Sequence, residues 1–247
     1  MKNMMLSIMA MIVSILSGDA QTYQVGDIYD VDGVKGIVVN VDVSGQHGLI
    51  MSLKGFKGKW GKVAGYNKFT KAYDELNGVN NCKKIKAFIN SDDFDSAWED
   101  FPLFDWTRSL GDGWYIPSNE ELKLIARGIG GCDYPECNVD KVMEFNDRIK
   151  KAKGETIVHD ELVGGLDAKS KITTAKDRFL PMFSSTERKG GYVYMLSFRA
   201  TEEIVLSDDG KHRKVKQKGE FQLIPAVKNP YTSALFRNQF SRAVHKF

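Results

Sequence analysis

The clearest pattern of hydrophobic and polar positions lies between residues 111 and 129, GDGWYIPSNEELKLIARGI. Its two glycines predict a turn, and the bulky run from Trp114 to Ile116 predicts a short extended segment. Ser118 followed by Glu121 has the spacing of a capping box, so we expect a helix to begin here. The apolar residues of that helix share one face at helical spacing: Leu122, Ile125, Ala126 and Ile129. We expect Trp114 and Leu122 to belong to the core that this element organises.

Three further stretches have helical periodicity. Asn80 or Asn81 is expected to cap a helix that runs through Asn90. The stretch from 92 to 110 continues the pattern, and Pro102 is expected to divide it into two helical pieces. Asn138 precedes a third helix, whose inward positions are Val139, Val142, Phe145 and Ile149.

Strands are predicted where apolar and polar residues alternate. Gly36 to Val43 and Leu49 to Leu53 are expected to form a hairpin, with residues 21–32 as a lead-in. Later strands are expected at Tyr192–Phe198, Glu203–Leu206 and Phe221–Val227, with 215–217 pairing back. Residues 155–181 have mixed periodicity and predict a long excursion with little regular structure. Such loops are usually functional or mobile.

The N-terminus is typical of a signal peptide. Lys2 precedes an apolar run from Met4 to Leu16, which is short for a membrane span, and small residues stand at Gly18 and Ala20. We expect cleavage after Ala20, so that residues 1–20 are the signal peptide and 21–247 a single domain. The protein is then exported to the periplasm, the cell surface or the extracellular space, with no membrane span after cleavage. An uncleaved anchor is the alternative.

Export changes how the three cysteines are interpreted, because disulfides form in oxidising compartments. Cys132 and Cys137 flank a turn-like insert and are expected to form a local disulfide. Their spacing also suits the start of a zinc site, but no second Cys or His pair follows at a matching spacing. Cys82 lies on a predicted helix and is interpreted as a small buried apolar residue.

Composition limits the classes of function. The formal net charge is only +3 over 247 residues, and the basic residues are scattered apart from Lys211–Lys218, so nucleic acid is not indicated. The chain has no P-loop, no GxGxxG after a strand, no HExxH and no GxSxG. No cofactor, metal or catalytic residue is therefore predicted.

Seven residues are candidates for ligand contact. Trp60 and Tyr66 lie among lysines and glycines, where exposed aromatics stack on sugars or bases; the alternative, which we favour, is that they pack onto the core. His159, Asp160 and Glu161 form the densest polar trio, but consecutive residues in an extended chain point alternately and do not all converge. Arg188 and Tyr192 flank the Gly190-Gly191 turn beside this excursion.

The serine pair before that turn is a further polar feature. Ser184 and Ser185 precede Glu187, an arrangement that would suit a serine nucleophile assisted by the glutamate. Hydroxyls at a strand entrance more often bond to the backbone, and we expect that role here.

Two separated stretches resemble one family. TRSLGDGWYIPSNEELKLI is similar to the signature of bacterial exported proteins with a C-type-lectin-like fold, among them the Lcl C-terminal-like domain of unknown function. SSTERKGGYVYMLSF, the opening hairpin and the terminal RAVHKF also resemble segments of that family. The resemblance implies an α+β domain with two or more helices around twisted antiparallel sheets and a long loop as the usual ligand region. The triplets of calcium-dependent sugar-binding lectins are missing, so calcium-mediated sugar binding does not carry over.

Three functions are compatible with this sequence. The first is an exported, calcium-independent binding or adhesion-type module for an unknown glycan or protein ligand. The second is an envelope enzyme that acts on glycan or protein side chains. The third is a structural subunit of a surface assembly, with the hydrophobic C-terminal tail as its interface. We favour the binding module, because catalytic motifs are missing.

Overall fold

The computed structural model describes residues 21–61, 69–91, 97–157, 182–188, 192–206, 213–227 and 240–247. The predicted signal peptide therefore lies outside the described residues, as does the excursion from residue 158 to 181. No helix in the described part is both long enough and apolar enough to cross a membrane.

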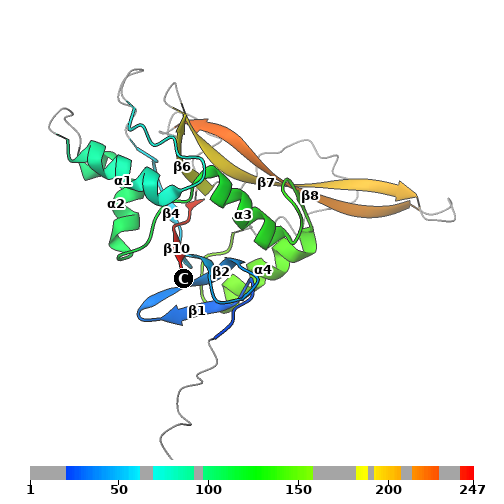
Figure 1. The fold of residues 1–247 in the computed structure, drawn as a ribbon. Coiled ribbons are helices and arrows are strands. Elements are labelled where there is room, and N and C mark those ends of the chain that lie inside the picture. The colour runs from blue at the N-terminus through cyan, green and yellow to red at the C-terminus, as the bar shows by residue number, and fades with distance from the viewer. Residues whose placement is uncertain are drawn as a thin grey trace, which may run out of the picture.

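The described residues form an α+β fold (Figure 1). Its helices are α1 (Gly78–Ile89), the 3-10 turn η1 (Trp98–Asp100), α2 (Pro102–Ser109), α3 (Asn119–Gly130) and α4 (Val139–Lys151). Its strands are β1 (Ile28–Val31), β2 (Val34–Val41), β3 (Gly48–Met51), β4 (Phe56–Lys57), β5 (Glu136–Cys137), β6 (Met182–Arg188), β7 (Tyr192–Leu206), β8 (Arg213–Val227), β9 (Phe240–Ser241) and β10 (Val244–Lys246).

Two four-stranded antiparallel sheets make up most of the strand structure described. One has the order β1-β2-β3-β10, the other β5-β8-β7-β6, and β4 pairs with β9 as a separate ribbon. Helix α3 lies between the two larger sheets and contacts both (Figure 1). The core forms where apolar faces of α3 and α4 meet β2, β3, β7 and β8. A second apolar cluster joins α1, α2 and Trp60 to β6 and β7.

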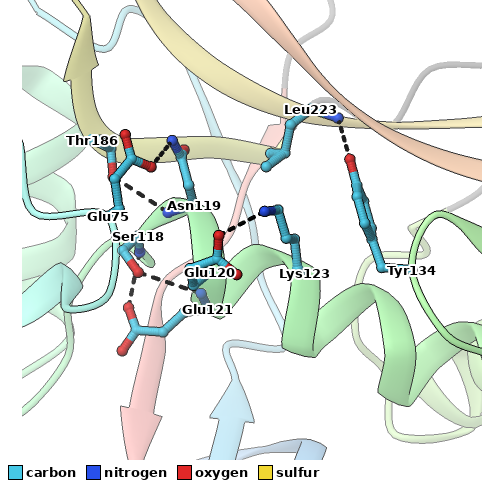
Figure 2. Close-up of polar contacts among 9 residues, drawn as sticks. All are labelled: Glu75, Ser118, Asn119, Glu120, Glu121, Lys123, Tyr134, Thr186 and Leu223. Carbon is cyan, nitrogen blue, oxygen red and sulfur yellow. Dashed lines mark hydrogen bonds and ion pairs between the residues drawn. The ribbon is translucent and has the colours of Figure 1, made fainter.

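Helix α3 begins as the sequence predicts. The Ser118 N–H donates to Glu121 Oε2 at 2.8 Å, and the Glu121 N–H donates to Ser118 Oγ at 3.3 Å, which completes the capping box (Figure 2). The four apolar positions named for this helix are all buried. Asn119, the first residue of α3, donates its N–H to Thr186 Oγ1 on β6, so the helix start is tied directly to the second sheet (Figure 2).

Close contact between α3 and β2 depends on one glycine. A Cβ placed on Gly128 would stand 1.8 Å from the carbonyl oxygen of Val39, a backbone atom that has little room to move. The helix axis therefore approaches the strand more closely than any side chain at this position permits.

The start of α1 differs from the prediction. Asn77 caps the helix by accepting from the N–H of Asn80, so α1 begins before the expected cap residues. Asn81 instead lies fully buried inside the helix, where its Nδ2 donates to the Asp74 carbonyl oxygen at 2.6 Å. The earlier start is set by the loop before α1, which uses Asn81 as a tertiary contact. The other boundaries hold: Pro102 opens α2, and Asn138 caps α4.

The strands are longer than the alternation predicts. Residues 203–206 continue β7, and residues 215–217 belong to β8, which pairs with β7 in one continuous antiparallel register from Tyr192↔Val227 to Leu206↔Arg213. The lead-in also contains a strand, β1, paired with β2. At the C-terminus Val244 is fully buried, and Phe247 packs against Tyr23 and Tyr29, so this part of the tail belongs to the fold.

Two expectations about side chains need correction. Trp114 is half-buried and stands at the edge of the core: it packs against two buried apolar clusters and edge-on against His245, with 5.5 Å between ring centroids. All three cysteines are free thiols, so the expected Cys132–Cys137 disulfide is not formed. Cys137 is buried with its Sγ turned toward Gly219 of β8, where an added Cβ would stand 2.3 Å from the sulfur.

Candidate functional site

A pocket of about 350 Å³ opens between α1, η1, α2 and the turn before α3. This volume falls at the small end of the range for ligand sites, about 300–1,000 Å³. Four segments supply its lining: Val79, Cys82, Lys83, Lys86, Trp98, Phe104, Thr107, Arg108, Gly111, Asp112, Gly113, Trp114 and Tyr115. The walls therefore combine aromatic rings with basic side chains.

Helix α1 presents two faces because its sequence has two stripes. Ile85, Phe88 and Ile89 are buried in the core. Cys82 and Lys83 follow Val79 by three and four residues, and Lys86 follows them by four and three, so all four lie along the adjacent stripe that borders the pocket. The apolar face packs α1 onto the core, and the stripe that carries the lysines lines the pocket.

Arg108 on α2 positions the indole of Trp98. Its guanidinium carbon lies 4.2 Å from the centre of the Trp98 ring, and Arg108 Nη2 also contacts Asp105 Oδ1 at 2.7 Å. Cation–π contacts of this kind hold an aromatic ring in a defined orientation. Trp98 thus lines the pocket from a short 3-10 turn with a cation against its ring.

Another wall is the glycine turn before α3, from Gly111 to Tyr115, which the sequence pattern predicts. Gly111 and Gly113 have φ of 108° and 83°, values that side-chain-bearing residues rarely adopt. A Cβ on Gly113 would also stand 2.2 Å from His245 Nε2. The backbone of Tyr115 then pairs with Val244 of β10, with N–O distances of 2.9 and 2.8 Å. This pairing fixes the turn to the first sheet and places Trp114 at the pocket.

Tyr115 closes the floor through a buried carboxylate. Its hydroxyl donates to Glu121 Oε1 at 2.8 Å, while Glu121 Oε2 accepts from the N–H groups of Gly78 and Ser118. Burial raises the pKa of Tyr115, and the negative charge of Glu121 raises it further. The phenol is therefore a neutral hydrogen-bonding group and not an acid at physiological pH.

Burial also disfavours the thiolate form of Cys82, which lines the pocket. Burial raises the pKa of Cys82 to about 12, while the hydrogen bond with the Ile116 backbone lowers it only in part. A nucleophilic cysteine needs the thiolate form near neutral pH. The described residues also hold no group of three or more His, Cys, Asp or Glu side chains that would bind a metal ion.

Charge in the pocket is predominantly positive. Lys83, Lys86 and Arg108 stand against one acid, Asp112. Arg108 is paired with Asp105, but neither lysine forms an ion pair within the described part of the chain. Both lysine side chains are exposed on α1.

Comparisons with protein-family models, curated proteins and solved structures give no match.

None of the predicted ligand residues that the structure describes lines this pocket. Trp60 is fully buried, and its Nε1 donates to the Ser184 carbonyl oxygen at 2.8 Å, so its ring does not reach a surface ligand. This placement agrees with the alternative that it packs onto the core. Arg188 and Tyr192 are brought together as a cross-strand pair at the end of β6 and β7, both exposed. Tyr66, His159, Asp160 and Glu161 lie outside the described residues.

The serine pair has the structural role that we expected. Ser185 Oγ donates to the Pro117 carbonyl oxygen at 3.1 Å, and both serines are fully buried. Glu187 accepts from Thr70 Oγ1 and from the N–H of Lys71. These residues fasten β6 to the loops around it.

Sequence reasoning missed the pocket because its walls are distant in sequence. Lys83 and Lys86 precede Trp98 and Trp114 by at least 12 residues, and only the tertiary fold brings them together. The sequence did contain one signal of the pocket. The lysines of α1 lie next to its apolar stripe, and the segments that follow α1 carry tryptophans.

Proposed function

We propose that this chain is an exported binding module that holds a ligand, part of a glycan or of a protein, in the pocket between α1, α2 and the turn before α3. The observation that carries the proposal is a preformed cavity of about 350 Å³ whose lining includes Trp98 and Trp114. Half-buried tryptophans beside an open cavity are typical of binding sites, since they offer a large contact area at a low cost in side-chain entropy.

The finer fold assignment belongs to this proposal. The order of the capped helix, the serine-bearing strand and the terminal strand supports a C-type-lectin-like domain similar to the Lcl C-terminal-like domain. Binding is expected to be independent of calcium, because the sequence lacks the triplets that hold calcium in sugar-binding lectins. Residues 1–20, which have the composition of a signal peptide, support export.

The test is a binding screen with matched tryptophan variants. The mature protein is applied to a glycan array and to a library of ring compounds, together with Trp98→Ala and Trp106→Ala. Trp106 stacks on Phe56 and does not line the pocket, so its variant controls for the loss of an indole. We expect hits that disappear with Trp98→Ala and persist with Trp106→Ala. A screen without hits, or hits insensitive to Trp98→Ala, would contradict the proposal.

A further inference from the structure

We propose that the pocket selects a ligand that carries a carboxylate or sulfate on a ring. This inference rests on the proposed binding function and adds the chemical class of the ligand. Its first support is charge: Lys83 and Lys86, which form no ion pair with any residue that the structure describes, stand on one stripe of α1 at the cavity, and Asp112 is the one acid among the lining residues. An anion that enters is attracted by both lysines, whereas a cation is repelled.

The second support is the shape and chemistry of the walls. Trp98, Phe104, Trp114 and Tyr115 line the cavity, and aromatic walls favour a flat or ring-shaped group over a flexible chain. Aromatic walls also line sites for quaternary ammonium ligands. Here the surrounding lysines exclude that class, because they disfavour any cationic ligand.

The third support is that Arg108 and the two lysines have different roles in the pocket. Arg108 is engaged by Asp105 and by the Trp98 ring, so it positions a wall. The lysines have no such engagement within the described residues, and their flexible stems let the ammonium groups follow an acidic substituent on the ligand. Asp112, on the turn opposite α1, is placed to accept hydrogen bonds from hydroxyl or N–H groups on the ring.

Two kinds of compound share this chemistry, namely acidic sugars and aromatic acids. The probes are therefore two matched pairs: glucuronate with glucose, and indole-3-acetate with its alcohol, tryptophol. Affinities are measured by calorimetric titration at low and at high salt. We expect at least one acid to bind about tenfold more tightly than its neutral partner, and the pair that responds identifies the ligand as sugar or aromatic. Raising the salt should reduce the difference, since exposed charges are screened.

Variants of α1 assign the preference to the two lysines. Lys83→Gln with Lys86→Gln should weaken binding of the preferred acid about tenfold, which corresponds to about 1.4 kcal/mol, and leave its neutral partner unchanged. Lys83→Arg with Lys86→Arg keeps both charges and should retain the acid preference. Lys84→Gln removes one positive charge from the same helix at a position outside the pocket, and should change affinity less than twofold.

Several results would overturn the inference. Equal binding of an acid and its neutral partner would remove the charge selection while leaving the binding function in place. Equal losses for Lys84→Gln and for the Lys83 and Lys86 double variant would show a general effect of net charge. Failure of both acids to bind would also contradict it, and the tryptophan-dependent screen would then decide separately whether the pocket binds other ligands.

Discussion

The carboxylate of Glu121 on α3 accepts a hydrogen bond from the backbone N–H of Gly78, the first residue of α1, at 2.9 Å. The same oxygen accepts from Ser118, and the other carboxylate oxygen accepts from the Tyr115 hydroxyl. One buried side chain therefore joins the starts of two helices to the floor of the pocket. The N-terminal ends of both helices favour a negative charge at this point.

Removing this carboxylate should destabilise the whole domain. Glu121→Ala leaves three donors without their acceptor, and we expect the free energy of unfolding to fall by about 3 kcal/mol or more. Glu121→Gln keeps one carbonyl oxygen for the two backbone donors and should cost less, about 1–2 kcal/mol. Urea denaturation measures both. A loss below about 1 kcal/mol for the alanine variant would mean that the network does not stabilise the fold.

The tryptophan of the organising turn should matter less for stability than a core leucine. Leu122 is fully buried, so Leu122→Ala should cost about 2–5 kcal/mol. Trp114 is half-buried, and Trp114→Ala should cost only about 1–2 kcal/mol, below the usual cost of deleting a buried aromatic. Chemical denaturation of the two variants in parallel tests the order. A larger loss for Trp114→Ala would place that side chain in the core.

Gly128 provides a test of the contact between α3 and β2. Glycine to alanine within a helix normally stabilises by about 0.5–1 kcal/mol. Here the added methyl group would overlap the Val39 carbonyl oxygen, and we expect a net loss of about 1–3 kcal/mol. Arg127→Ala, at the neighbouring exposed position, is the control and should change stability little. A more stable Gly128→Ala protein would contradict the packing of helix on strand.

The cysteines should titrate as three thiols with unequal access. Burial raises the pKa of Cys82 and of Cys137 to about 12, so at pH 8 both are protonated as well as shielded. Because thiolate forms as the pH rises toward the pKa, their native reactivity should stay low at pH 8, and Cys132 should be alkylated first. Mass spectrometry after alkylation, native and denatured without reductant, measures this. A single reactive thiol in the denatured protein would show instead that Cys132 and Cys137 form a disulfide.

Calcium should leave the stability unchanged. A metal that binds only the folded state raises the thermal midpoint by mass action. Calcium needs six to eight converging oxygen ligands, and the sequence supplies no calcium loop. We therefore expect the same midpoint with chelator and with millimolar calcium. A rise of several degrees with calcium would favour a calcium-dependent lectin.

Local signals in the sequence were sufficient where the structure is decided locally. The Ser118–Glu121 capping box and Pro102 at the start of α2 depend on neighbouring residues, and both were predicted correctly. The start of α1 was missed because Asn81 is recruited by Asp74 and by β6, contacts that no local pattern reveals. The continuity of β7 was missed because the polar run Thr201-Glu202-Glu203 interrupts the alternation, whereas pairing with β8 holds the backbone extended.

The candidate site was harder to predict than the fold. Trp114 was assigned to the core because bulky residues in a short extended run usually bury. In the structure it is half-buried and packs against His245, which is 131 positions later in the chain. The lysines of α1 become candidates for ligand contact only when the fold brings them to the same pocket as the tryptophans of η1 and of the turn. A pocket between distant segments depends on the tertiary fold. A single sequence predicts the segments but not that they meet.

The pocket is tested most directly by the indole N–H signals of the four tryptophans in an NMR titration. Trp98 and Trp114 line the cavity, whereas Trp60 is fully buried and Trp106 stacks on Phe56. With ¹⁵N-labelled protein and the acid that binds most tightly, we predict that the Trp98 and Trp114 signals shift together and saturate at one affinity, while those of Trp60 and Trp106 stay in place. Saturable shifts at Trp106 alone, or binding that moves neither Trp98 nor Trp114, would contradict the central claim that this pocket is the ligand site.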